Sequence, residues 1–127
     1  MPEPALILFA HGARDPEWAK PVQAVATQLR MRFPERKVGV AFLEFLSPTL
    51  PDLVASLVQS CANSASRIDI LPFFIAQGGH LRKELPEMLA TLQQHYPHTA
   101  FRLLPPLGEL PEVQVAMAGA IAGLVSH

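Results

Sequence analysis

Two histidines, His11 and His80, stand beside glycines shortly after apolar runs with the sequences LILF and IDILPFFI. Three of the seven glycines, Gly12, Gly78 and Gly79, adjoin these two histidines. A glycine at such a position lets the backbone turn sharply or come close to a ligand. Neutral imidazoles bind divalent metal ions, and imidazoles also exchange protons near neutral pH. One shared site explains the repeated arrangement better than two unrelated loop histidines.

Charged residues accompany both histidines. Arg14 follows the first histidine, and Arg82 and Lys83 follow the second, so their side chains could bind carboxylates or phosphates at the rim of a cleft. For Lys83 an ordinary solvated surface is an equally good interpretation. Glu44, near the end of another apolar run, could add an oxygen ligand to two imidazoles. Such a ligand set leaves open positions, which suits a metal in transit or in catalysis better than a structural metal.

Other candidate residues carry weaker signals. His95 and His98 have the spacing of a metal-ligand pair, but Pro97 between them breaks the helix that would align them. Cys61 is the only cysteine, which excludes an internal disulfide and a multi-cysteine metal centre. The sequence contains neither a Walker-type glycine loop nor a GxSxG motif. It therefore gives no sign of a nucleotide phosphate cradle or of a serine nucleophile.

Four apolar runs alternate with four segments of helical periodicity. Runs of this kind are typical of strands buried on both faces of a parallel sheet. The expected strands are residues 6–9, 38–45, 68–75 and 100–104, and the expected helices begin near Asp15-Pro16, Ser47–Thr49, Leu85-Pro86 and Leu110. The alternation predicts an α/β fold in which a four-stranded parallel sheet is flanked by helices, with right-handed crossovers. The common flavodoxin-like order 2-1-3-4 makes the first and third strands neighbours and brings His11 and His80 to one edge.

The helical periodicity also predicts which side chains face a core. The predicted inward positions of the first and last helices are Trp18, Val22, Val25, Leu29 and Phe33, and Val113, Met117, Ile121 and Leu124. Pro21 lies early in the first helix and could kink it. Asp15 is expected to cap a helix, and Glu84 to be a cap or a surface charge, rather than catalysts.

The composition fits a single domain over residues 1–127. The formal net charge of −1 gives no global attraction to nucleic acid or to anionic membranes, so neither is an expected partner. The first residues, MPEPALILFAHG, have no basic flank, and their apolar run is too short for a signal peptide, so the cytoplasm is the expected location. Hydrophobic residues make up 50% of the chain and the mean hydropathy is +0.24, which predicts that an oligomer covers part of the surface.

The motifs of the chain resemble those of a known family. HGARDP after the first expected strand and PFFIAQGGHLRKELP after the third are similar to motifs of the small (CbiX-type) sirohydrochlorin cobaltochelatases. These are class II, ATP-independent tetrapyrrole chelatases, related in fold to ferrochelatase, and the resemblance covers essentially the whole chain. It implies that His11 and His80 bind the metal and that Glu44 contributes, as an acid does in some relatives. Ala13 and Glu84 stand where the family often has Ser and Asp, and neither is a supposed metal ligand.

The resemblance implies a chelatase-like half module that forms a homodimer, because longer members of the family contain two such modules. It implies insertion of a divalent metal, Co²⁺ first and Fe²⁺ or Ni²⁺ as alternatives, into sirohydrochlorin for cobalamin or siroheme biosynthesis. The metal is then a substrate, and no permanently bound cofactor is expected. The residues expected to bind the tetrapyrrole are Arg14, Arg82, Lys83, Gly12, Gly78 and Gly79.

Two other functions remain open on the residues alone. A non-catalytic carrier of metal or tetrapyrrole would use the same histidines and would bind without turnover. A phosphoryl-transfer enzyme would use His11 as its nucleophile and Arg14 as its phosphate clamp, but it would leave His80 without a role.

Overall fold

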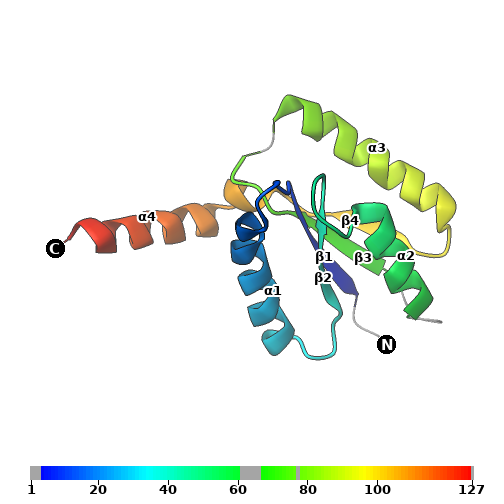
Figure 1. The fold of residues 1–127 in the computed structure, drawn as a ribbon, viewed down its shortest axis with the longest axis horizontal. Coiled ribbons are helices and arrows are strands. Elements are labelled where there is room, and N and C mark those ends of the chain that lie inside the picture. Colours follow the sequence, from blue (N-terminus) through cyan, green and yellow to red (C-terminus); the bar gives the residue numbers. More distant parts are fainter. Residues whose placement is uncertain (1–3, 61–66, 77, 127) are drawn as a thin grey trace.

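The computed structural model of the protein describes residues 4–60, 67–76 and 78–126, so Cys61 lies outside the described residues. The described residues form a parallel four-stranded sheet in the order β2-β1-β3-β4, with helices on both faces (Figure 1). The strands are β1 (Ala5–Ala10), β2 (Val38–Phe42), β3 (Arg67–Pro72) and β4 (Ala100–Leu103). The helices are α1 (Lys20–Arg32), α2 (Leu50–Ser60), α3 (Gly79–His95) and α4 (Pro111–Val125), with short 3-10 helices η1 (Pro16–Ala19) and η2 (Leu107–Glu109). The predicted fold class and strand order are confirmed.

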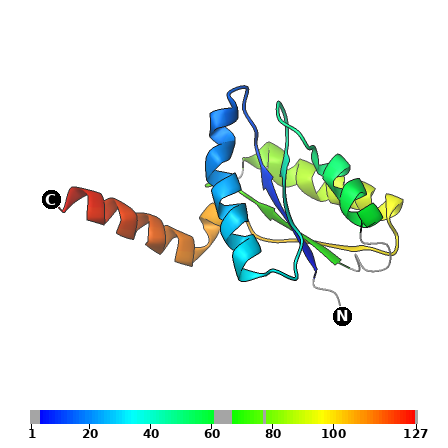
Figure 2. The same cartoon turned by 60° about the horizontal axis from the view of Figure 1, so that its bottom comes forward.

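Strand β1 lies at the centre of the core, and all six of its residues are buried. Successive side chains of a strand point to opposite faces of the sheet. Ile7 and Phe9 therefore pack with α2 and α3, whereas Leu6 and Leu8 pack with α1. Figure 2 shows α1 on one side of the sheet and α2 and α3 on the other. Burial on both faces explains why the sequence of this strand is apolar throughout.

The chain enters its first helical segment as predicted. The Asp15 carboxylate accepts a hydrogen bond of 3.0 Å from the backbone N–H of Glu17, and Pro16 is the first residue of η1. Pro21 lies in the first turn of α1 rather than inside a continuous helix. A proline in the first turn removes no hydrogen bond of α1, so this position gives no physical reason for a kink. At the start of α2, Thr49 Oγ1 accepts a hydrogen bond of 3.3 Å from the N–H of Asp52.

The predicted inward face of the first helix is only partly correct. Val22 is buried, but Val25 and Phe33 are exposed, and so is Trp18 on η1. The 3-10 helix η1 leads directly into α1, and the buried residues Val22 and Ala26 lie in the first half of α1. The helical period therefore located the helix but not its whole buried stripe.

Helix α3 begins earlier than the sequence pattern predicts. It starts at Gly79, so His80 lies in its first turn and Pro86 lies inside the helix. The pattern favours a start at Leu85-Pro86 because proline is common at the first helical position. Burial of Leu81 and Leu85 against the sheet outweighs the backbone hydrogen bond that an internal proline removes.

Strand β3 carries a carboxylate, Asp69, that is buried in the described structure. Asp69 on β3 is 1% exposed and accepts two hydrogen bonds of 2.9 Å from Arg102, its partner on β4. The guanidinium groups of Arg67 and Arg36 approach the same carboxylate, at 3.1 Å and 3.9 Å. These ion pairs hold the edge strand β4 to β3 and give the buried charge the partners it needs.

Helix α4 extends away from the rest of the domain (Figures 1 and 2). None of its 15 residues is buried, and the predicted inward residues Ile121 and Leu124 are 60% and 79% exposed. The predicted inward face therefore holds only at the start of the helix, where Val113 and Met117 are half-buried and line a small pocket with Phe73 and Phe74. Glu112 is the only charged residue of the helix, and a helix that is apolar all round is normally covered by protein. Among the described helices, none combines the length and apolar character needed to span a membrane.

Candidate functional site

The sequence motifs lie on segments that leave the carboxyl edge of the sheet. Because the strands are parallel, β1, β2 and β3 all end at this edge. His11 directly follows β1, Glu44 follows β2 by two residues, and His80 lies in the first turn of α3. Open α/β sheets bind their ligands at this edge. The topology therefore brings the motifs of three separate segments to one side of the molecule.

The backbone of His11 is held by contacts that extend the pairing of β1 with β2. The N–H of Leu43 donates to the Ala10 carbonyl at 2.9 Å, and the N–H of Glu44 donates to the His11 carbonyl at 3.1 Å. Gly12 then turns with a φ of +84°, and a Cβ added there would lie 2.0 Å from the Glu44 carbonyl oxygen. The predicted sharp turn is confirmed, and only glycine satisfies both its backbone angle and this close contact.

The imidazole of His11 lies on the face of the sheet that α3 covers. It continues the side-chain alternation of Ile7 and Phe9, which pack on that face. The His11 ring packs against the ring of Phe74, with 5.3 Å between the ring centroids. Phe74 is buried, so it gives the imidazole a fixed wall on one side. His11 itself is exposed, which leaves the imidazole accessible to a ligand.

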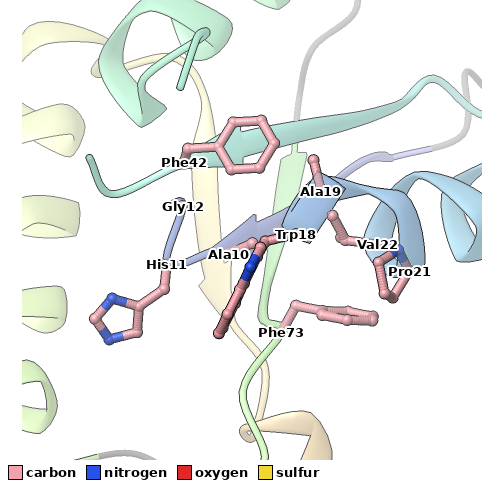
Figure 3. Close-up of a pocket in the computed structure, with 9 residues that line it drawn as sticks. All are labelled: Ala10, His11, Gly12, Trp18, Ala19, Pro21, Val22, Phe42 and Phe73. Atoms are coloured by element: carbon pink, nitrogen blue, oxygen red, sulfur yellow. The ribbon is translucent and has the colours of Figure 1, made fainter. Parts of the chain in front are cut away.

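A small pocket of about 150 Å³ opens beside His11. It is lined by Ala10, His11, Gly12, Trp18, Ala19, Pro21, Val22, Phe42 and Phe73 (Figure 3). Figure 3 shows the imidazole of His11 pointing away from the apolar lining, so the pocket borders the backbone of His11 rather than enclosing its ring. Trp18, which the helical period places in the core, is 75% exposed and lines this pocket.

His80 is held in a different way. Its side chain is 87% exposed, and its Nε2 lies 2.9 Å from Oε1 of Glu84, one helical turn further along α3. A carboxylate that accepts from one imidazole nitrogen orients the ring and leaves the other nitrogen, Nδ1, for a metal or a proton. Gly78 and Gly79, which precede His80, have no described atom within 4 Å of an added Cβ. Their surroundings are therefore open.

The three predicted cations differ in their surroundings. The guanidinium of Arg14 lies over the ring of Phe45, 5.2 Å from its centroid. Nη2 of Arg82 lies 2.8 Å from Oε2 of Glu109, so an acid partly offsets its charge. Lys83 is exposed on the first turns of α3. All three side chains can reach solvent near the carboxyl edge.

The predicted ligands do not form a closed metal centre within the described part of the chain. There, no group of three or more His, Cys, Asp and Glu residues is placed to hold a metal ion. The backbones of His11 and Glu44 are hydrogen-bonded to each other, whereas the His80 ring is paired with Glu84. The joint action of His11, His80 and Glu44 on a metal is therefore a proposal, developed below.

The sequence patterns missed three aromatic residues at this edge. Phe45 and Phe74 fall inside the apolar runs expected as strands, but β2 and β3 end before them, at Phe42 and Pro72. Pro72 is the one available signal, because proline cannot donate to a sheet ladder and often marks the end of a strand. Trp18 was missed because it lies on η1, before α1, where it lines the pocket beside His11 and stays exposed.

Comparison with solved structures shows the same fold in other proteins. A CbiX protein of cobalamin (vitamin B12) biosynthesis from Marinobacter aquaeolei superposes with a TM-score of 0.83 at 24% identity, over 97% of this chain and 98% of that one. The sirohydrochlorin chelatase SirB from Bacillus subtilis subspecies spizizenii, in complex with cobalt, superposes with a TM-score of 0.79 at 20% identity. That match covers 96% of this chain but only 51% of SirB.

Comparison with curated sequences points to the same group of proteins. The sirohydrochlorin cobaltochelatase of Methanococcus aeolicus is 30% identical over 89 residues, which are 70% of this chain. The match spans 60% of the length of that relative. The family model described as CbiX matches residues 5–122, which include every candidate site residue named above. The chain therefore belongs to the CbiX family.

Proposed function

We propose that this chain inserts a divalent metal ion into sirohydrochlorin without ATP. The observation that carries the proposal is the placement of two exposed imidazoles, His11 and His80, beyond neighbouring parallel strands at one edge of the sheet. Membership of the CbiX family supports it, and so does the name of the relative from Methanococcus aeolicus, a sirohydrochlorin cobaltochelatase.

The chemistry of insertion matches the groups at this edge. A divalent metal enters a tetrapyrrole by replacing two pyrrole N–H protons, so the site must hold a metal and accept protons. The imidazoles of His11 and His80 do both, since neutral imidazole binds the metal and imidazole accepts protons near neutral pH. The carboxylates of sirohydrochlorin bind Arg14, Arg82 and Lys83 through charge-assisted hydrogen bonds. Glu44 has a supporting role as a third ligand.

The proposed metal is Co²⁺. The name of the curated relative and the cobalt complex of SirB support this choice. Fe²⁺ and Ni²⁺ are the alternatives, because imidazole binds all three ions and selectivity depends on geometry and supply. The product belongs to cobalamin biosynthesis if the metal is cobalt and to siroheme biosynthesis if it is iron. A cytoplasmic location is proposed on the sequence grounds given above.

We also propose that two copies of the chain form the working unit. The pocket beside His11, at about 150 Å³, is far smaller than the several hundred Å³ of a usual ligand site, so one chain offers a wall rather than a closed cleft. This chain matches about half of SirB, at 51% of its length, and a second copy would supply a second module. The uncovered apolar helix α4 supports the same proposal, because a partner would bury it.

The function is tested by anaerobic incubation of the protein with sirohydrochlorin and Co²⁺, Fe²⁺ or Ni²⁺, with insertion followed by absorbance. We expect a metal-dependent spectral change that is faster than in protein-free solution and slow in His11→Ala. The matched control is His95→Ala, which removes an exposed histidine from the last turn of α3 and should leave the rate unchanged. Insertion no faster than in protein-free solution would contradict the proposal, and binding without insertion would favour a carrier.

A further inference from the structure

Phe45 has a backbone conformation that a phenylalanine rarely adopts. Its φ is +68°, and the Glu44 carbonyl accepts a hydrogen bond of 2.8 Å from the N–H of Leu46. This combination is the pattern of the classic γ-turn, which is rare and strained, and glycine or asparagine adopts positive φ more easily. Burial of the ring does not compensate for the strain, because Phe45 is 57% exposed. An exposed aromatic side chain in a strained turn is often retained for a function.

The turn that contains Phe45 is fixed relative to His11. The residue before it, Glu44, donates its N–H to the His11 carbonyl at 3.1 Å. The carbonyl oxygen of Glu44 lies so close to Gly12 that no side chain fits there. The same peptide segment thus binds the His11 loop on one side and closes the γ-turn on the other. The position of the Phe45 ring is therefore set by the same contacts as the position of His11.

Arg14 is arranged around the same ring. Its guanidinium lies over the Phe45 ring at 5.2 Å from the centroid, and within the described residues no carboxylate forms an ion pair with it. A guanidinium held over an aromatic ring keeps its charge and its hydrogen-bond donors available. Phe45 and Arg14 together present an apolar ring surface beside a positive charge, near His11.

A second arginine–phenylalanine pair provides an internal comparison. Arg36 lies over the ring of Phe33 at 5.4 Å, and Phe33 is 45% exposed. Phe33, however, has an ordinary φ of −130° at the end of α1, and Arg36 is 3.9 Å from the buried Asp69. Ion pairing and helix termination account for this pair. Neither accounts for Arg14 and Phe45.

We propose that the exposed side of the Phe45 ring stacks against the flat face of the tetrapyrrole, while Arg14 binds a carboxylate at its periphery. This inference rests on the proposed function and adds to it the residue that sets the orientation of the macrocycle relative to His11. Stacking on an aromatic ring suits a conjugated ligand, and the adjacent guanidinium suits its carboxylates. Phe45 is thus a positioning residue for the macrocycle.

The experiment is an anaerobic titration of the protein with metal-free sirohydrochlorin, with binding followed by absorbance. Phe45→Gly relieves the strained turn and removes the ring, so we expect the Kd to rise about tenfold while the melting temperature stays the same or rises. Phe45→Tyr keeps the ring and should bind within about twofold of the wild type. Phe33→Gly is the matched control on the other pair, and its Kd should also stay within about twofold.

The outcomes separate this inference from the proposed function. Phe45→Gly with the affinity of the wild type would overturn the inference, whatever the rate of metal insertion. Equal loss of affinity in Phe45→Gly and Phe33→Gly would overturn it too, because the effect would not be specific to this ring. Wild-type protein that binds the macrocycle through Phe45 but inserts no metal would leave the inference standing and remove the chelatase proposal. Wild-type protein that binds no sirohydrochlorin would overturn both.

Discussion

The two histidine segments follow neighbouring strands of one sheet, yet they are built differently. After β1, the chain stays in contact with the neighbouring loop: the His11 carbonyl accepts from Glu44, and the His11 ring packs on Phe74. After β3, the chain reaches His80 only in the first turn of α3, where the side chain is 87% exposed and pairs with Glu84 on its own helix. One imidazole is positioned by tertiary contacts, and the other by a helix and a single carboxylate.

The two histidines therefore differ in what fixes them: tertiary contacts fix the position of His11, and a neighbouring carboxylate fixes the orientation of the His80 ring. The position of His11 depends on residues far from it in sequence, because Glu44 and Phe74 come from other segments. The ring of His80 is oriented by Glu84, four residues away, through one exposed contact of 2.9 Å. A single exposed contact on one helix is weak, so the His80 ring should reorient more readily than the His11 ring.

The largest effect should come from removing either imidazole. His11→Ala and His80→Ala should each slow Co²⁺ insertion by about a hundredfold or more, the usual scale for the loss of a positioned acid or base. The double variant should be little slower than either single one, because groups that act as a unit are not additive. Glu44→Gln should have a smaller effect. Initial rates measured with sirohydrochlorin, with circular dichroism as the check on folding, test the set.

Two results would contradict the joint action of His11 and His80. Folded single variants with rates near the wild type would remove both histidines from the mechanism. Effects of His11→Ala and His80→Ala that multiply in the double variant would show that the imidazoles contribute independently of each other. The exposed His95, at the far end of α3, provides the control for nonspecific loss of an imidazole.

The second-largest effect should come from replacing Gly12, and it should be absent when Gly78 is replaced. Gly12→Ala places a Cβ at a φ of +84° and against the Glu44 carbonyl, so it should destabilise the protein by about 1–3 kcal/mol and slow insertion by moving His11. Gly78→Ala is the matched control, because its φ is −67° and no described atom lies within 4 Å of the added carbon. Chemical unfolding compares the two, and equal stability of both variants would show that the turn at Gly12 relaxes easily.

The contrast between these regions also shows how far the sequence predicts the structure. The buried strands and their order follow from apolar runs and the alternation with helices, which are local signals. The turn at Gly12 was predictable for the same reason, because a glycine directly after a buried strand indicates a sharp turn or a close approach of the backbone. The conformation of Phe45 was not, because its turn is held in place by the hydrogen bond from Glu44 to the His11 carbonyl, and that bond requires the folded sheet.

The helices show a similar limit. The start of α3 at Gly79 conflicts with two local rules, that glycines mark loops and that Pro86 marks a first turn. Burial of Leu81 and Leu85 decides against both rules, and the sequence alone does not reveal what they pack against. The inward face predicted for α4 holds for Val113 and Met117 but fails for Ile121 and Leu124, because the helix extends away from the described part of the domain beyond its first turns (Figure 1).

A smaller effect should come from the carboxylate beside His80. Glu84→Gln keeps the shape of the side chain but removes the charge that pairs with Nε2 at 2.9 Å. Loss of such an orienting partner should slow insertion about tenfold, with little change in stability, because exposed pairs one turn apart contribute only about 0.2–0.5 kcal/mol. Insertion rates and melting temperatures measured on one preparation separate the two. An unchanged rate would mean that the pair is only a surface contact.

The smallest effect should distinguish the cations of the two segments. Arg14 has no acidic partner among the described residues, whereas Arg82 is 2.8 Å from Glu109. Arg14→Ala should therefore weaken sirohydrochlorin binding about three- to fivefold and Arg82→Ala only about twofold, with little effect of either on metal binding. Salt should reduce the difference, since charges on exposed groups are screened over about 8 Å at physiological ionic strength. Titrations at low and high salt test this. Wild-type affinity in both variants at low salt would mean that the basic rim does not bind the carboxylates. A larger loss with Arg82→Ala would mean that the macrocycle lies toward α3 rather than over Phe45.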